Sequence, residues 1–222
     1  MKNQDYDTLI KKAVNDFWET RKVQKGVLAG KQLDSFIALL RKVAKESGVP
    51  NECIHEKNGH VPGYFRATKE WDMVITTPKG NLAAAIELKS QVGSYGNNLN
   101  NRVEESIGSA EDFWTAFREK SFTSTQTPWL GYFIVVGDDE TSRHPVKVNN
   151  PLFSARREFD GASYLDRYTI LCQRLVLEHK YNAVALLATA DKAHYRSLAE
   201  SISVRSFLQS FKGYLSGIKD EF

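Results

Sequence analysis

Two acidic residues and a lysine lie on two short apolar segments that a turn connects. Asp72 stands at the start of the first segment, and Glu87 and Lys89 stand near the end of the second. The Pro-Lys-Gly-Asn sequence between the segments is typical of a turn, so residues 70–89 predict a β-hairpin. A turn centred on residues 79 and 80 pairs positions whose numbers sum to 159. Asp72 is then opposite Glu87, and Glu87 and Lys89 share one face of their strand.

Two carboxylates at facing strand positions, with Cβ atoms about 5 Å apart, repel each other and destabilise a hairpin. A divalent cation between them reverses that cost, because hard cations bind carboxylate oxygens. Lys89, one alternation step further along, could hold a water molecule or a phosphate beside the metal. These groups suit metal-assisted hydrolysis of a phosphodiester. The same spacing also fits a solvent-facing strand on which Lys89 neutralises two acids, and the spacing alone does not separate the two interpretations.

Length and composition describe an ordinary globular chain. It has 222 residues, of which 41% are hydrophobic and 26% are charged, and its formal net charge is +3. A chain of this length can bury a sizeable core. The small positive charge permits a nucleic-acid partner without requiring one, so local clusters of basic and amide side chains must carry that argument.

Cysteine usage and hydropathy exclude several classes of protein. Cys53 and Cys172 have no paired spacing, which argues against a disulfide framework and a zinc site and favours buried thiols in a reducing compartment. The amino terminus is polar, and no run approaches 18 apolar residues. We therefore expect a cytoplasmic protein with no membrane association.

The apolar periodicity predicts helices interleaved with strands. Around the hairpin, residues 129–137 and 181–190 are expected to form buried strands, and residues 51–69 and 138–160 are expected to be irregular. Helices are expected at about residues 6–25, 32–45, 101–119, 163–179 and 204–216. This order predicts an α/β fold with a central mixed sheet of about four to five strands flanked by helices. We expect one domain over residues 1–222, with an N-terminal helical part at 1–48 and a core at 70–190.

An asparagine-rich stretch follows the strand that carries Lys89. Because Asn is unfavourable in helix interiors, the stretch is expected to be a loop that leads into the next helix. Amide and guanidinium groups can bind base edges and phosphates, although turn and capping chemistry would also explain them. The candidate DNA-binding residues are Asn97, Asn98, Asn100, Asn101 and Arg102, with Arg156 and Arg157 of the long irregular segment as second candidates.

Four further acids lie on predicted helices. Glu19 and Asp34 could approach the hairpin and assist a metal ion there, although most such residues are solvated or capping groups. Glu104 and Glu105 fall in the first turn of the helix expected at residues 101–119, where carboxylates favour the helix N-terminus. We therefore assign these two a structural role.

The hairpin resembles the catalytic signature of a nuclease superfamily. Asp72 followed by Glu87-Leu88-Lys89 matches the Asp…(Asp/Glu)-x-Lys pattern of restriction-endonuclease-like enzymes, although Trp71 stands where the superfamily often has proline. The run from Ile86 to Gly108 is more specific and resembles the XhoI-type restriction endonucleases. Shorter similar stretches occur over residues 13–21, 30–34 and 158–164, so the resemblance covers most of the chain.

The resemblance implies a restriction-endonuclease-like fold and a type II enzyme that cuts double-stranded DNA. Asp72, Glu87 and the Leu88 carbonyl would bind Mg²⁺, with Mn²⁺ able to substitute, and Lys89 would act on the attacking water. A homodimer would read a palindrome, CTCGAG or a relaxed or related site, and leave five-prime overhangs. A cognate DNA methyltransferase would be its functional partner.

Other functions fit the same residues. A structure-specific nuclease, such as a junction resolvase or repair nuclease, would use the same chemistry on branched or damaged DNA. A non-catalytic DNA-binding module would keep the fold and lose cleavage, although the intact set of Asp72, Glu87 and Lys89 argues against it. A plain α/β scaffold leaves the Asn-rich stretch unexplained.

Overall fold

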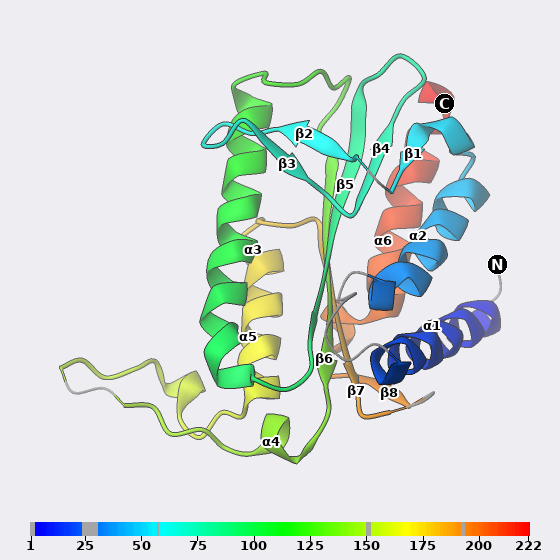
Figure 1. Cartoon of the computed structure of the whole chain (residues 1–222). Helices are drawn as coiled ribbons and strands as arrows, with labels where there is room; N and C mark the ends of the chain where they lie inside the picture. Colours follow the sequence, from blue (N-terminus) through cyan, green and yellow to red (C-terminus); the bar gives the residue numbers. More distant parts are fainter. Residues whose placement is uncertain (1–2, 24–30, 57, 150–151, 192–193) are drawn as a thin grey trace.

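A six-stranded mixed sheet forms the centre of the protein, whose structure is a computed structural model that describes residues 3–23, 31–56, 58–149, 152–191 and 194–222 (Figure 1). The strand order is β1-β4-β5-β6-β7-β8. The strands are β1 (Ile54–His55), β4 (Met73–Thr76), β5 (Leu82–Gln91), β6 (Trp129–Gly137), β7 (Ala183–Thr189) and β8 (Tyr195–Ser197). β5, β6 and β7 run parallel, and the outer pairs are antiparallel. The predicted α/β class with a mixed sheet is confirmed.

The described sheet has six strands where four to five were expected, because its two edge strands are very short. β1 has two residues and β8 has three, so neither is long enough to show an alternating pattern. A separate hairpin, β2 (His60–Pro62) paired with β3 (Thr68–Glu70), lies in the segment 51–69 that we expected to be loop. The expectation of an irregular segment there was wrong.

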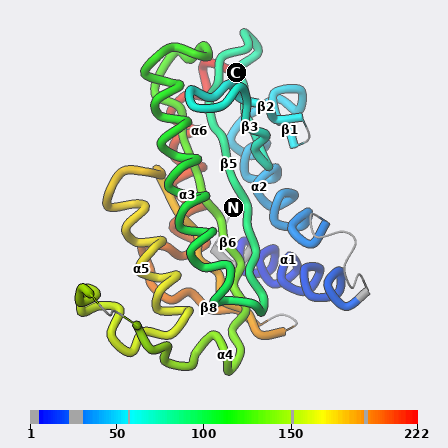
Figure 2. The backbone as a smooth tube through the Cα atoms, turned by 60° about the vertical axis from the view of Figure 1, so that its left-hand side comes forward, coloured from blue at the N-terminus to red at the C-terminus, as the bar shows by residue number. Residues whose placement is uncertain are grey.

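Helices cover both faces of the sheet and make two cores. On one face α1 (Asn3–Val23), α2 (Asp34–Glu46) and α6 (Val204–Gly217) pack on apolar side chains such as Ile86, Leu88 and Phe133. On the other face α3 (Tyr95–Arg118) and α5 (Tyr164–Leu177) pack on Ala85 and Tyr132. Figures 1 and 2 show α3 and α1 on opposite sides of β5. Both cysteines are buried and free, as expected.

The helix after β5 begins at Tyr95 rather than near residue 101, so the Asn-rich stretch is mostly helical and our loop prediction was wrong there. Ser94 adopts a left-handed conformation (φ 47°) immediately before the helix. Tyr95 and Leu99 are then buried, at 2% and 7% exposure. Burial of these two side chains stabilises the first turns by more than the low helix propensity of Asn costs them.

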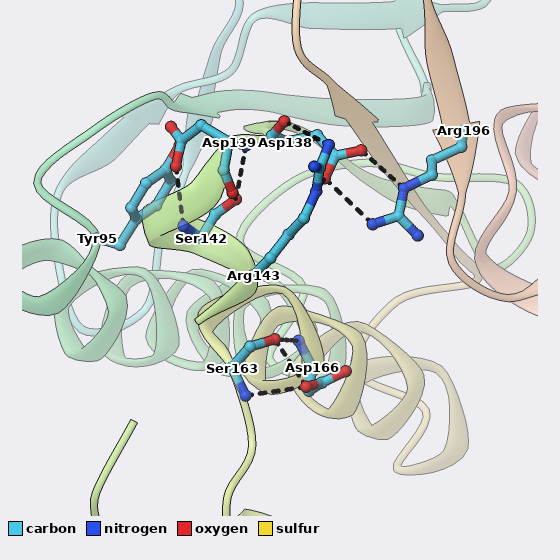
Figure 3. A network of polar contacts seen from close by, with 8 residues as sticks. All are labelled: Tyr95, Asp138, Asp139, Ser142, Arg143, Ser163, Asp166 and Arg196. Carbon is cyan, nitrogen blue, oxygen red and sulfur yellow. Dashed lines mark hydrogen bonds and ion pairs between the residues drawn. The ribbon is translucent and has the colours of Figure 1, made fainter. Parts of the chain in front are cut away.

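A polar network at the carboxyl end of β6 holds the start of α3 in place (Figure 3). The Tyr95 hydroxyl donates to Asp139 Oδ2 at 2.6 Å. Asp139 also caps the short helix α4 (Glu140–Arg143), where its side chain and that of Ser142 form a reciprocal capping box. The direction in which β5 turns into α3 is therefore set by a residue 44 positions further along the chain.

Between Asp138 and Asp160 the described residues, 138–149 and 152–160, are largely irregular, as predicted, apart from α4 and a 3₁₀ turn at Arg157–Phe159. Part of this segment extends away from the body of the molecule (Figures 1 and 2). Among the described helices, none combines the length and apolar character that crossing a bilayer requires.

Candidate active site

The hairpin has the predicted register. Met73 pairs with Ile86 and Val74 pairs with Ala85, and both pairs have the expected sum of 159. The ladder shifts only near the turn, between Ile75 and Thr76. Asp72 directly precedes the last ladder pair and stays close to the partner strand, where its Oδ2 accepts a hydrogen bond from the Leu88 amide at 2.7 Å. The carboxylate of Asp72 therefore extends the hairpin beyond its last main-chain pair.

Glu87 is a buried carboxylate held between two lysines. It is only 5% exposed. The Lys89 ammonium forms an ion pair with Glu87 Oε1, and the Lys69 ammonium lies 2.9 Å from Oε2. Buried carboxylates need such partners, because loss of hydration destabilises the charged form. Lys69 belongs to β3, and the Glu-x-Lys spacing that identifies Lys89 gives no indication of it.

Asp72 is in an environment that opposes its ionisation. Burial raises the pKa of its carboxyl above the ordinary value, and the nearby charge of Glu87 raises it further. The hydrogen bond from the Leu88 amide and the charges of Lys89 and Lys69 lower the pKa by less. The acid pair thus carries electrostatic repulsion that a bound cation would relieve.

The main chain of Leu88 adds an oxygen at the same place. Within a strand paired in antiparallel fashion, the amide and the carbonyl of one residue point to the same side. The Leu88 amide points to Asp72, so its carbonyl points to this edge as well, beyond the final pair of Met73 and Ile86.

These oxygens fit a hard divalent cation. Two carboxylates and one carbonyl are the donor types that Mg²⁺ and Mn²⁺ prefer. Glu87 Oε2 is buried and has an ion pair with Lys69 but no hydrogen bond of good geometry, so this oxygen would bind a metal ion in competition with Lys69. The described residues include no group of three His, Cys, Asp or Glu side chains placed for a metal ion. The Leu88 carbonyl is the candidate third protein ligand.

A pocket of about 360 Å³ opens beside Glu87, between β3, β5 and α3. Basic side chains and acids share its wall with two tyrosines, Tyr132 of β6 and Tyr181 just before β7. Tyr132 is opposite Glu87 across β5 and β6, and its hydroxyl makes no hydrogen bond to the described residues. The charged lining residues are Arg66, Lys69, Glu87, Lys89, Arg102, Glu104 and Glu105. A wall with four cations suits an anionic substrate such as a phosphodiester.

Asp112 of α3 attaches the β2–β3 hairpin to this pocket. Its Oδ1 accepts hydrogen bonds from the amides of Tyr64, at 2.9 Å, and Phe65, at 2.7 Å. Its Oδ2 is 3.0 Å from Arg66 Nε. A Cβ at Gly63 would approach Asp112 Oδ2 to 2.6 Å, so glycine is needed for this close contact. One buried acid therefore positions the hairpin that carries Arg66 and Lys69.

The predicted DNA-binding residues on α3 separate by helix face. Arg102 lies in the pocket with Glu87 and pairs with Glu105. By helical spacing, Asn98 and Asn101 fall on the same side of α3 as Arg102. Asn100 instead lines an apolar cavity of about 480 Å³ between α3 and α5, which lacks Asp72 and Glu87. Asn97 is exposed at the boundary between these faces.

The remaining candidates lie elsewhere. Arg156 and Arg157 are exposed on the long irregular segment, where Arg156 pairs with Glu158 at 2.9 Å. Glu19 is on α1, across the sheet from the pocket, and pairs with Lys22 at 3.1 Å. Asp34 is exposed at the start of α2. Neither Glu19 nor Asp34 lines the pocket that contains Glu87.

Glu104 and Glu105 do line that pocket, and their expected position in the first helical turn was wrong. Because α3 begins at Tyr95, they lie more than two turns into the helix, where its N-terminal dipole no longer explains them. For Glu105 the sequence spacing indicated this position, since residues 102, 105 and 109 lie on one face of a helix.

A mixed sheet between helices, with Asp72 next to one hairpin strand and Glu87 and Lys89 on the other, is the arrangement expected of a restriction-endonuclease-like nuclease. Comparison with known proteins agrees. The sequence profile of the family "Restriction endonuclease XhoI" matches residues 17–200. The chain belongs to the XhoI restriction endonuclease family, a family of type II site-specific deoxyribonucleases.

Characterised relatives cover most of the chain. The type II restriction enzyme BstVI of Geobacillus stearothermophilus is 45% identical over 194 residues, which are 83% of this chain and 87% of that protein. The type II restriction enzyme XhoI of Xanthomonas vasicola is 40% identical over 78% of this chain and 77% of its own length. AbrI of Azospirillum brasilense, also a type II restriction enzyme, is 37% identical over 69% and 76%. No solved structure gives a significant match.

Proposed function

We propose that this protein makes metal-dependent double-strand cuts at a short palindromic DNA site, CTCGAG or a relaxed or related sequence, and leaves five-prime overhangs. The observation that carries the proposal is the pair of acids at the end of the hairpin, with Lys89 beside them and a basic pocket open to substrate. Family membership supports the specificity class. Two copies of the chain would read the two halves of the palindrome, because a two-fold site matches a two-fold dimer.

Each residue of the site has a role in this proposal. Asp72, Glu87 and the Leu88 carbonyl would hold Mg²⁺, or Mn²⁺ in its place, and the metal would lower the pKa of a bound water and neutralise charge on the phosphate. Lys89 orients or deprotonates the attacking water. Arg102 and Arg66 lie along the pocket and bind phosphate oxygens. In-line attack inverts the phosphorus and needs no covalent enzyme intermediate.

The reading surface in this proposal is the first half of α3. Asn98, Asn101 and Arg102 share the face that lies next to the site and are assigned to base edges or to phosphates near the cut. Asn97 and Asn100, together with Arg156 and Arg157, extend the contact to flanking DNA. Each lost base contact would reduce discrimination by about 1–3 kcal/mol. A DNA methyltransferase of the same specificity would protect the host DNA, and the pair would work in the cytoplasm.

A plasmid that carries one CTCGAG site tests the proposal directly. With Mg²⁺ the protein is expected to produce one linear product, and sequencing of its ends gives the site and the stagger together. A matched plasmid without the site should remain supercoiled. Cleavage that depends on a branch or a lesion would identify a structure-specific nuclease instead.

Variants of the three site residues test the chemistry. Asp72→Asn, Glu87→Gln and Lys89→Ala are each expected to lower cleavage at least 100-fold, since each removes a ligand or the group that acts on the water. Binding of a DNA fragment with the site should persist, measured by gel shift with Ca²⁺. Full cleavage by all three variants would contradict the assignment. Absence of cleavage by the native chain with either metal, together with intact binding, would indicate a non-catalytic DNA-binding module.

A further inference from the structure

Lys69 is the one cation in the pocket that touches the catalytic acid from outside the Glu-x-Lys strand, within the described residues. Its ammonium lies 2.9 Å from Glu87 Oε2. It also lies 4.7 Å from the centre of the Trp71 ring, and the Trp71 side chain is itself buried. An aromatic face attracts a cation, and the Lys69 side chain is only 14% exposed. The ammonium is therefore held in a defined position by two groups.

That position conflicts with a metal ion. Lys89 occupies one oxygen of Glu87 and Lys69 occupies the other, so both oxygens already face a positive charge. A divalent cation bound by Asp72 and Glu87 needs at least one of these oxygens. Two cations on one buried carboxylate oxygen repel each other strongly, since the surroundings screen them little. The metal therefore competes with the two ammonium groups for Glu87.

The structure distinguishes the two lysines. Lys89 shares a strand face with Glu87, two residues away on β5, so the strand itself keeps the two residues neighbours. Lys69 reaches Glu87 from a different strand, and its side chain already lines the pocket next to Arg66 and Arg102. A change of its flexible side chain can turn the ammonium away from Glu87 towards a phosphate in the pocket.

We propose that Lys69 is a counter-ion that stands in for the metal on Glu87 in the metal-free protein and moves to a phosphate of the DNA when metal and substrate bind. Lys69 thereby lowers the metal affinity of the free enzyme and couples tight metal binding to the arrival of DNA. This inference rests on the proposed metal-dependent function.

Metal binding without DNA provides the test. Lys69→Met removes the charge and keeps much of the length and apolar bulk of the side chain. The matched control is Lys79→Met, because Lys79 is exposed in the hairpin turn and the substitution changes the net charge equally. Lys69→Arg retains a cation. Mn²⁺ affinity is measured for each by calorimetry, and thermal unfolding without metal shows that each variant is folded.

The Lys69→Met variant is expected to bind Mn²⁺ roughly tenfold more tightly than the native chain, since it loses a cation next to the ligand. Lys79→Met and Lys69→Arg should stay close to native. Mn²⁺ should also raise the melting temperature of Lys69→Met by more than that of Lys79→Met. With saturating Ca²⁺, Lys69→Met should bind DNA more weakly than the control in a gel shift, since a phosphate loses its partner.

Two results would overturn the inference in distinguishable ways. Mn²⁺ binding by the native chain that is equally tight in Lys69→Met and Lys79→Met would exclude the counter-ion role and leave the proposed function standing. Absence of Mn²⁺ binding in Lys69→Met as well as in the native chain, with and without DNA, would remove the metal site and the inference together.

Discussion

At the scale of single residues, the environment of Asp72 carries a cost to the stability of the metal-free protein. Its carboxyl is desolvated and faces Glu87, and both effects raise its pKa. The hydrogen bond from the Leu88 amide offsets part of this cost. Active sites commonly keep such unfavourable groups, because the ligand or the transition state supplies the missing counter-charge.

The Asp72→Asn substitution is therefore expected to stabilise the metal-free protein by about 1 kcal/mol at pH 7. The amide keeps an oxygen for the Leu88 amide and removes the repulsion from Glu87. The folded-state pKa of Asp72 lies above its ordinary value of 3.8. The charged carboxylate therefore destabilises the native chain at pH values above the folded-state pKa, and this destabilisation disappears below about pH 3.8. Urea denaturation of both proteins without metal, between pH 4 and pH 8, should show a difference that shrinks as the pH falls.

At the scale of elements, the long and strongly patterned segments were predictable. β6 matches its expected bounds of residues 129–137, and α6 extends one residue beyond its expected end. Elements that depend on partners elsewhere were missed. The short strands β1 and β8 exist only because β4 and β7 offer them an edge, and the start of α3 depends on burial of Tyr95. Local sequence cannot report contacts that the fold creates.

The β2–β3 hairpin is another element that the sequence did not predict, because its turn is held by Asp112 of α3. We expect Asp112→Ala to lower the free energy of unfolding by about 2 kcal/mol, because two amides and Arg66 lose a charged acceptor. Asp112→Asn keeps an acceptor for the amides and should cost less. The informative measurement is hydrogen exchange at the Tyr64 and Phe65 amides, which should accelerate most in Asp112→Ala. Unchanged exchange there would show that the turn holds its position without Asp112.

At the scale of the whole molecule, the site combines residues that the sequence pattern already grouped with residues that only the fold brings together. Asp72, Glu87 and Lys89 lie on one hairpin, so spacing and strand alternation were enough to group them. The remainder of the pocket wall comes from the β2–β3 hairpin, from α3 and from Tyr132 and Tyr181, and only the folded chain brings those residues to Glu87. For that reason Lys69 and Glu104 received no functional assignment from the sequence.

One acid, Asp138 at the end of β6, connects helix α4 and strand β8 to this end of the sheet, although β8 is far from the other two in sequence (Figure 3). Arg196 of β8 donates from Nε to Asp138 Oδ2 at 2.7 Å, and Arg143 of α4 donates from Nε to Oδ1 at 2.7 Å. The hydrogen bond from Arg196 and that from Arg143 lower the pKa of Asp138 from 3.8 to about 2 against the opposing effect of burial. The edge strand β8 and helix α4 are thus attached to β6 by a charge that persists at neutral pH.

Asp138→Asn should destabilise the protein by about 1–2 kcal/mol at pH 7, the opposite sign to Asp72→Asn. A lowered folded-state pKa contributes stability above the unfolded value of 3.8, and that contribution is lost as the pH falls towards 2. The difference between Asp138→Asn and the native chain should therefore be constant from pH 8 to about pH 5 and narrow below pH 4. Urea denaturation across this range measures it, with Asp72→Asn as the matched change of one carboxylate. A difference that stays constant down to pH 3 would mean that Asp138 stabilises this edge by packing or by neutral hydrogen bonds rather than by its charge.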